Sequence, residues 1–390
     1  MIAGVARETW PGERRVALVP GLVPGLKKAG LDVVVEAGAG QEAGFPDGDY
    51  RDKGARIESR DEVSRADVLL QVRSLAGYEG APPPGLDLVR PGQTVIGLLD
   101  PVWAPPGVRA LSERGATALA MELMPRITRA QSMDALSSTA TIVGYKAVLL
   151  AADALPRMFP MLMTAAGTVA SARVFVVGAG VAGLSAIATA RRLGATVEAY
   201  DVRAAVKEQV SSLGAKFVEL PLEAGGAEGQ GGYAREMDEA FYRKQAETMA
   251  RVVAASDVVI LAAAVPGRKS PVLVTREMVE AMRPGSVVVD VAAEQGGNCE
   301  ATVPGQTLTV RGVTVMGPLN LAAAVPYHAS QLYAKNIVTF LLSLLKGGAL
   351  VLDPGDDIVR ETLVIRDGEV VHPRVREALG LPLLYPAAPA

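Results

Sequence analysis

Residues 172–201 read ARVFVVGAGVAGLSAIATARRLGATVEAYD, and this stretch decides the fold. An apolar run over 172–178 leads into the glycine pattern GxGxxG, an alanine-rich run that ends at Gly194, and a second apolar run that ends on Asp201. Runs of this kind predict a strand, a helix and a second strand. Two parallel strands joined by a helix form a βαβ unit. The stretch therefore predicts a parallel sheet covered by helices.

Each glycine of the pattern has a physical reason to be there if the turn binds a dinucleotide. Gly178 permits the tight turn, Gly180 lets the backbone approach a pyrophosphate, and Gly183 lets the helix pack closely on the strand. The helix N-terminus then faces the phosphate charge. A glycine-rich turn without a ligand is the alternative. The preceding strand, the following helix and the acid at the end of the next strand favour a dinucleotide site.

Asp201 indicates which dinucleotide is bound. A carboxylate at this place accepts hydrogen bonds from both hydroxyls of the adenosine ribose. A 2′-phosphate would face the same negative charge, so NAD(H) is favoured over NADP(H). Arg203 is close enough in sequence to weaken that preference, but it does not replace the acid.

Two further strand ends belong to the same predicted crevice, because ligands bind beyond the carboxyl ends of parallel strands. AAAVPG (262–267) and AAEQGG (292–297) end in small residues that suit close approach to a cofactor, although plain turns explain each nearly as well. The candidate cofactor-binding residues are Gly178, Ala179, Gly180, Val181, Gly183, Asp201, Val202, Arg203, Tyr233, Ala264 and Glu294.

The alternation of strand-like and helix-like runs continues along the chain and predicts its organisation. Two long helical stretches, 133–155 and 329–345, flank the central block. We expect an α/β protein of two Rossmann-like domains with parallel sheets, joined by the two long helices, with the cofactor in the cleft between the domains. The first domain is expected to comprise 1–132 and 330–390, and the NAD(H)-binding domain 133–329.

The composition excludes several classes of protein. With 49% hydrophobic and 21% charged residues, the 390-residue chain is typical of globular proteins with large cores. Its 39 basic and 42 acidic side chains give a net charge of −3, which argues against nucleic acid as a partner. The lone Cys299 excludes a disulfide framework and fits a reducing cytosol. Only two histidines, His328 and His372, are present, so a histidine metal site or a Ser-His-Asp triad has little raw material.

No stretch of the chain is a convincing membrane segment. The start carries charge by Arg7 and does not look like a signal peptide. Residues 147–167 are interrupted by charges and Pro156, and 337–345 are too short for a span, which needs roughly 20 apolar residues. We expect no direct membrane insertion, so that a partner would supply any attachment to a membrane.

The stretch PRITRAQSMDALSS (125–138) is unusually polar for a segment that precedes a long helix. One interpretation is a site for chemistry. The other is a solvated helix start, in which Ser132 caps the helix and Asp134 interacts with its N-terminal dipole. A second unusual stretch, PLEAGGAEGQGGYARE (221–236), is either a mobile lid that carries Tyr233 or a surface insertion.

These segments together resemble the proton-translocating NAD(P) transhydrogenases, in the form whose NAD(H)-binding alpha component is a separate soluble polypeptide. The similarity covers nearly the whole chain. It is carried by RETWPGERRVALVP (7–20), PRITRAQSMDALSS (125–138), VGAGVAGL (177–184) with YDVR (200–203), GGYAREM (231–237), VDVAAEQGGNCEAT (289–302) and ASQLYAKN (329–336).

The resemblance implies roles for the polar residues. Arg126, Gln131 and Asp134, with Ser137 following, occupy the positions of the family's catalytic loop beside the nicotinamide, and Tyr233 matches a tyrosine that closes over the nucleotide. It also implies a homodimer, an NADP(H)-binding beta subunit that docks over the nicotinamide, and a membrane-spanning subunit that translocates protons. Hydride would pass directly between NAD(H) and NADP(H). The chain would be cytoplasmic, peripheral to the inner face of the plasma membrane through its partners.

Alanine dehydrogenase has a related fold and is the main alternative. Arg15 matches the arginine which that enzyme uses on its substrate carboxylate, but QVRS (71–74) and GLLD (97–100) stand where its lysine and histidine are expected, and Glu294 replaces its aspartate. Amine oxidation needs a proton relay near neutral pH. Hydride transfer between two nicotinamides needs only orientation, dryness and polar groups. The absence of histidine before His328 therefore favours transhydrogenation.

Three questions stay open from the sequence. A non-enzymatic NAD sensor is a further alternative. His328 either caps or decorates the start of the second long helix or takes part in catalysis. Glu294 either contacts the nicotinamide ribose or caps a strand.

Overall fold

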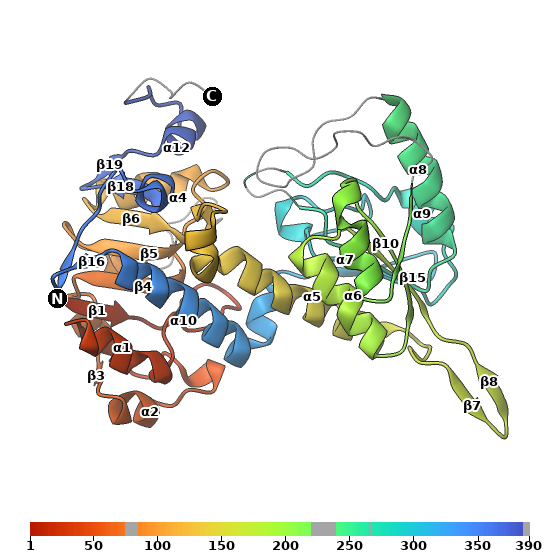
Figure 1. Cartoon of the computed structure of the whole chain (residues 1–390), viewed down its shortest axis with the longest axis horizontal. Coiled ribbons are helices and arrows are strands. Elements are labelled where there is room, and N and C mark those ends of the chain that lie inside the picture. Colours follow the sequence, from red (N-terminus) through yellow and green to blue (C-terminus); the bar gives the residue numbers. More distant parts are fainter. Residues whose placement is uncertain (75–84, 220–238, 265–266, 268, 385–390) are drawn as a thin grey trace. The chain divides into compact units, whose positions relative to one another are not determined.

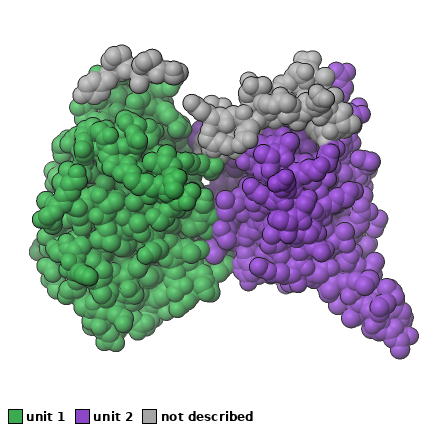
Figure 2. Space-filling view, viewed as in Figure 1, with its two compact units in different colours: residues 1–139, 323–390 green, residues 140–322 purple. Residues whose placement is uncertain are grey.

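The computed structural model describes residues 1–74, 85–219, 239–264, 267 and 269–384, and the chain divides into two compact units (Figures 1 and 2). Unit 1 comprises Met1–Thr139 and Ala323–Ala390, and unit 2 comprises Ala140–Ala322. The long helix α5 (Ala135–Ala154) runs from unit 1 into unit 2, and α10 (Pro326–Ser343) begins just after the chain returns to unit 1.

Unit 1 contains an eight-stranded sheet of order β19-β18-β6-β5-β4-β1-β2-β3. Its strands are β1 (Ile2–Val5), β2 (Asp32–Glu36), β3 (Arg56–Glu58), β4 (Val68–Arg73), β5 (Thr94–Leu98), β6 (Thr117–Ala120), β18 (Leu363–Arg366) and β19 (Glu369–Val370). The strands from β1 to β6 pair in parallel, and β18 and β19 add an antiparallel edge from the C-terminal segment. Its other elements are α1 (Val23–Lys28), α2 (Asp47–Asp52), α3 (Arg60–Val63), α4 (Pro105–Glu113), α11 (Asp357–Thr362), α12 (Pro373–Ala378), and the short pair β16 (Leu345–Lys346) and β17 (Ala349–Leu350).

Unit 2 contains a seven-stranded sheet of order β11-β10-β9-β12-β13-β15-β14. Its strands are β9 (Arg173–Val177), β10 (Thr196–Tyr200), β11 (Lys216–Phe217), β12 (Val258–Leu261), β13 (Val287–Asp290), β14 (Thr307–Val310) and β15 (Val313–Met316). Only β14 runs antiparallel to its neighbour. The helices are α6 (Val181–Arg192), α7 (Lys207–Ser212), α8 (Glu239–Ala254) and α9 (Arg276–Glu280), and a separate hairpin is formed by β7 (Leu162–Thr164) and β8 (Gly167–Val169).

Each sheet is covered on both faces because its central strands are apolar at every position. In β4 the side chains of Val68 and Leu70 join one hydrophobic cluster, and Leu69 joins another on the opposite face. In β12 Val258 and Ile260 join one cluster, and Val259 and Leu261 join the other. This alternation follows from the two-residue period of a strand. The structure confirms the predicted α/β class with two domains and parallel-dominated sheets, and adds antiparallel edge strands that the sequence pattern did not indicate.

Among the described residues, α5 is the one helix that is long and apolar enough to cross a membrane by length and composition. This is weak evidence for a span, because a core helix of a soluble protein passes the same test.

Candidate functional site

The turn between β9 and α6 has the geometry of a close-approach turn. Gly178 has a φ of +92°, and a Cβ atom there would lie 2.8 Å from the backbone of Ala262. A Cβ on Gly183 would lie 1.8 Å from the carbonyl oxygen of Gly178. A Cβ on Gly180 would meet nothing within 4 Å, so the space beside this residue is open. No side chain caps the N-terminus of α6, which leaves its first N–H groups available to a ligand.

Asp201 ties this turn to the end of β10. Its side chain is almost fully buried, and its Oδ2 atom accepts a hydrogen bond of 2.8 Å from the Ala179 N–H. Arg203 donates to the same carboxylate from its backbone N–H and its guanidinium. Val181 is exposed, and Val202 is half-buried. The structure therefore brings together the glycine turn, Asp201 and Arg203 at one edge of the sheet of unit 2.

A buried amide that the sequence reasoning missed holds the end of β12. The Asn298 Oδ1 atom accepts from the Ala263 N–H at 3.0 Å, and its Nδ2 atom donates to the carbonyl oxygens of Ala263 at 2.8 Å and Pro271 at 2.7 Å. Asn298 is fully buried. Because it holds both polar groups of Ala263, it fixes the backbone next to the exposed Ala264, one of the predicted cofactor-binding residues.

Asp290, at the end of β13, fixes Asn298 in turn. Its Oδ2 atom accepts from the N–H groups of Asn298 at 2.7 Å and Cys299 at 3.0 Å and from the Thr302 hydroxyl at 2.8 Å. Burial raises the pKa of the Asp290 carboxyl, and these hydrogen bonds partly offset the rise. The sequence signal was available, because Asp290 ends an apolar strand as Asp201 does.

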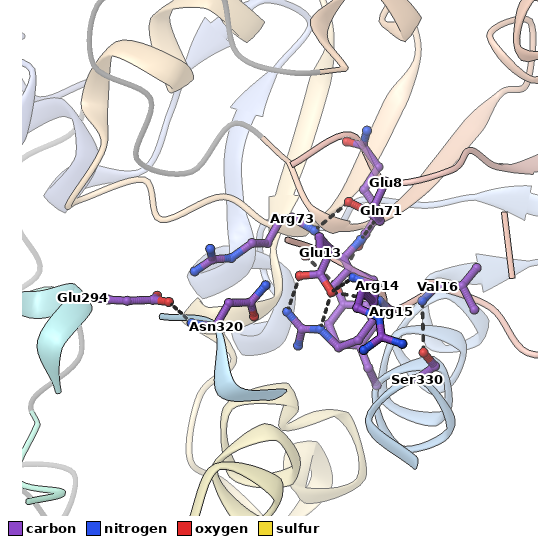
Figure 3. Close-up of polar contacts among 12 residues, drawn as sticks. Glu8, Glu13, Arg14, Arg15, Val16, Gln71, Arg73, Glu294, Asn320 and Ser330 are labelled. Atoms are coloured by element: carbon purple, nitrogen blue, oxygen red, sulfur yellow. Dashed lines mark hydrogen bonds and ion pairs between the residues drawn. The ribbon is translucent and has the colours of Figure 1, made fainter. Parts of the chain in front are cut away.

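Glu294 contacts a neighbouring loop of unit 2. Its Oε1 atom accepts from the backbone N–H of Asn320, a residue with a positive φ of 48° (Figure 3). The carboxylate is exposed and follows β13 in a short 3-10 helix, Ala293–Gln295.

The stretch 125–138 lies in unit 1 and forms a 3-10 helix, Thr128–Met133, followed by α5. Asp134 accepts from the Ser137 N–H at 2.9 Å and from its hydroxyl at 2.6 Å, so Asp134 caps the first turn of α5. The expectation that Ser132 caps this helix is wrong, because the Asp134 carboxylate takes that place. Arg126 and Gln131 are both exposed.

Arg129 and Tyr233 complete the placement of the polar residues. Arg129 forms two hydrogen bonds of 2.9 and 2.7 Å with Asp356, and this ion pair lowers the pKa of Asp356 to about 2. Arg129 thereby anchors the start of α11. Tyr233 and the rest of the predicted lid, 221–236, lie outside the described residues.

A buried ionic cluster follows the carboxyl ends of β1 and β4 in unit 1 (Figure 3). The Arg15 guanidinium donates to both oxygens of Glu13, at 2.8 and 2.7 Å, and both side chains are buried. Glu8 accepts from the N–H groups of Val72 at 2.6 Å and Arg73 at 3.2 Å. Burial, with a smaller repulsion from Glu13, raises the pKa of Glu8 to about 8.

The neighbouring strand ends carry two more features of this cluster. The Arg73 guanidinium lies 5.1 Å from the centre of the Trp10 ring. Glu122 accepts from the N–H groups of Leu99 and Asp100, and burial, followed by the charge of Asp100, raises the pKa of Glu122 to about 8. Arg73 and Asp100 belong to the segments where the lysine and histidine of an alanine dehydrogenase are expected.

The two histidines lie in different environments in unit 1. His328 is exposed in the first turn of α10, with its ring edge-on to Tyr327 at 5.2 Å. His372 is buried, and this burial lowers its pKa to about 4. Within the described part of the chain, no three His, Cys, Asp or Glu side chains are grouped so as to hold a metal ion.

Comparison with known proteins gives matches over almost the whole chain. The family models for the N-terminal and C-terminal domains of alanine dehydrogenase/PNT match residues 4–143 and 147–373. An NAD(P) transhydrogenase subunit alpha of Rhodospirillum rubrum, the first of the pieces into which that subunit is divided, is 47% identical over 96% of this chain and 98% of its own. A transhydrogenase structure from Sinorhizobium meliloti matches with a TM-score of 0.85 at 48% identity, covering 95% of this chain and all of that one. An L-alanine dehydrogenase structure matches with a TM-score of 0.82 at 29% identity, covering 97% of this chain and 99% of that one.

Proposed function

The chain belongs to the alanine dehydrogenase/PNT family of oxidoreductases, and from this premise we propose that it is the NAD(H)-binding alpha component of an NAD(P) transhydrogenase. In this proposal hydride passes directly between NAD(H) on this chain and NADP(H) on a partner subunit. One observation carries it: a buried Asp201 joined to the glycine turn makes an NAD-type nucleotide site in a chain that is 47% identical to a transhydrogenase alpha subunit.

The residues of unit 2 fit the nucleotide that the proposal requires. The open space at Gly180 and the uncapped N-terminus of α6 suit a pyrophosphate, and Asp201 suits a ribose with both hydroxyls free. Asn298 holds the adjoining strand end rigid through Ala263. When bound, the dihydronicotinamide supplies the hydride.

The polar stretch of unit 1 is assigned the positioning of the nicotinamide. Gln131 and Arg126 present exposed polar side chains, and the Asp134–Ser137 hydrogen bonds fix the backbone that carries them. No proton moves at the ring carbons in hydride exchange, so these residues need only orient a ring and exclude water. Tyr233 is assigned the closing of the site on the basis of the family resemblance.

The chemistry of unit 1 supports this assignment over an alanine dehydrogenase. Both donating edges of Arg15 that face Glu13 are engaged by that carboxylate, and arginine and aspartate stand at positions 73 and 100. An amine oxidation needs a group that exchanges protons near neutral pH at the reacting atoms. We therefore expect no turnover of NAD⁺ with alanine by the isolated chain.

The proposal includes partners that the chain itself does not contain. We propose a homodimer, an NADP(H)-binding beta subunit and a membrane-spanning subunit that couples hydride transfer to proton translocation. The chain would then be cytoplasmic and peripheral to the inner face of the plasma membrane through these partners.

The β7–β8 hairpin supports the homodimer. It extends away from the sheet of unit 2 (Figure 1), and every residue of both strands is exposed. It carries the exposed apolar side chains Met161, Leu162, Met163 and Val169. An isolated two-stranded hairpin is marginally stable in water, and apolar side chains gathered on a surface favour a protein contact.

Reconstitution tests the proposed function. The purified chain is mixed with the NADP(H)-binding component of a transhydrogenase, and reduction of an NADP⁺ analogue by NADH is followed. We expect exchange that depends on both components. A partner shown to be competent with another alpha component, but silent with this chain, would contradict the proposal.

A further inference from the structure

The carboxylate of Asp201 is fully occupied by donors from its own chain. Its Oδ1 atom accepts from the Arg203 N–H and Nε, both at 2.9 Å, and its Oδ2 atom accepts from Ala179 N–H and Arg203 Nη2, both at 2.8 Å. An ionised carboxylate offers about four lone-pair positions. These four donors therefore leave no free position for a ribose hydroxyl.

The four donors differ in how easily they can leave. The N–H groups of Ala179 and Arg203 belong to the turn after β9 and the chain after β10, and their positions are set by the backbone. The guanidinium of Arg203 is held on a flexible side chain that retains 19% of its exposure, while Asp201 retains 6%. A ribose that hydrogen-bonds to Asp201 must therefore displace this guanidinium.

From this geometry, resting on the nucleotide site of the proposed function, we propose that Arg203 is a specificity-determining residue. Its guanidinium leaves Asp201 when a ribose with free hydroxyls binds. It is also a latent binding group for a 2′-phosphate, which the charge of Asp201 neutralises. Selectivity for NAD(H) then depends on the pair and not on Asp201 alone.

The chemistry of arginine explains both halves of this role. A guanidinium matches a phosphate as well as it matches a carboxylate, through parallel N–H groups. While Asp201 is ionised, a 2′-phosphate meets a carboxylate and finds the guanidinium already bound. Once the charge of Asp201 is removed, the same guanidinium faces the phosphate without a competing anion.

The test uses adenosine nucleotides that lack the nicotinamide, so that it does not depend on hydride transfer. Binding of 5′-AMP and of adenosine 2′,5′-bisphosphate to the whole chain is measured by calorimetry. Asp201→Asn removes the charge and keeps an oxygen for the Ala179 N–H. We expect the affinity for the bisphosphate, relative to 5′-AMP, to rise on the order of 10- to 100-fold, the range of one charge-assisted contact.

Two double variants locate the origin of this gain. Asp201→Asn with Arg203→Met should lose it. Asp201→Asn with Arg192→Met should keep it, because Arg192 is an exposed arginine on α6 of the same unit. A gain that persists without Arg203, or no gain in a folded Asp201→Asn chain, would overturn the inference.

The single variant Arg203→Met gives a second reading that leaves Asp201 intact. It should bind 5′-AMP at least as tightly as the natural chain and up to roughly 10-fold more tightly, because no ion pair has to open. Weaker binding of 5′-AMP by this variant would overturn the inference. A natural chain that binds neither probe would instead overturn the nucleotide site and the proposed function with it.

Discussion

Removing the Asn298 side chain should loosen the nucleotide half of unit 2 and leave unit 1 intact. Asn298→Ala deletes the hydrogen bonds to the Ala263 N–H, the Ala263 carbonyl and the Pro271 carbonyl. A hydrogen bond contributes about 1 kcal/mol net, so the loss of these contacts should lower the free energy of unfolding of unit 2 by about 3 kcal/mol. NADH binding should weaken as well, because Ala263 sets the strand end beside Ala264.

The two units can be followed separately in one denaturation experiment. Both tryptophans, Trp10 and Trp103, belong to unit 1, so tryptophan fluorescence reports on that unit while far-ultraviolet circular dichroism reports on both. Asn298→Ala should move the transition seen by circular dichroism to lower urea concentration and leave the fluorescence transition in place. Gln306→Ala, which truncates an exposed amide of unit 2, should change unfolding by less than about 0.5 kcal/mol.

One result would refute the reasoning about Asn298. If Asn298→Ala and Gln306→Ala unfold alike and bind NADH alike, the buried amide does not hold the strand end. A shift of the fluorescence transition alone would be equally damaging, since it would place the effect in unit 1.

Three further predictions concern pH, assembly and catalysis. The pKa of Glu8 is raised to about 8, so folded unit 1 holds a proton that the unfolded chain releases, and stability should fall between pH 7 and 9; Glu8→Gln should flatten this fall in urea titrations, and equal slopes would refute it. His372 does not disturb this window, because its pKa is lowered to about 4 and its opposite contribution is complete below pH 7. Met163→Lys, on the exposed hairpin, should dissociate the homodimer in sedimentation experiments, whereas Val272→Lys, at another exposed apolar position of unit 2, should not; a dimer that survives both would exclude the hairpin as the contact. Gln131→Asn should keep near-normal NADH affinity and lose most of the hydride-transfer rate in the reconstituted system, and equal loss of both would count against its positioning role.

The nucleotide turn could be predicted because its chemistry is local. Gly178, Gly183 and Asp201 lie within one strand–helix–strand unit, and each is demanded by backbone geometry or by the charge of a ligand. The two-domain α/β class followed from the alternation of apolar runs, which depends on neighbouring residues only. These are the regions of the molecule where sequence distance and spatial distance agree.

The rest depends on contacts between distant segments. Asn298 acts on Ala263 and Pro271, and the Tyr333 hydroxyl donates to the Gln71 carbonyl oxygen at 2.7 Å across most of the chain. The antiparallel edge strands β18 and β19 are too short to carry a periodic signal. Asp134 replaced Ser132 as the cap of α5 because the 3-10 helix before α5 places the carboxylate at the helix start. No pattern of single residues expresses these arrangements.

The saturation of Asp201 shows the same limit at the site itself. Its identity and its place at a strand end were readable from the sequence, but the four donors around its carboxylate were not. They turn a simple acid into one half of a pair, and the selectivity of the site then depends on Arg203 as well.

Isotope tracing tests the central claim most directly. NADH carrying deuterium at the transferred position of the nicotinamide is mixed with this chain, the NADP(H)-binding component and an NADP⁺ analogue, and the products are examined by mass spectrometry. Direct transfer predicts that the deuterium appears in the reduced NADP analogue and none in water. Deuterium released to water, or no transfer with a partner known to be competent, would contradict the assignment of this chain as the NAD(H)-binding component of a transhydrogenase.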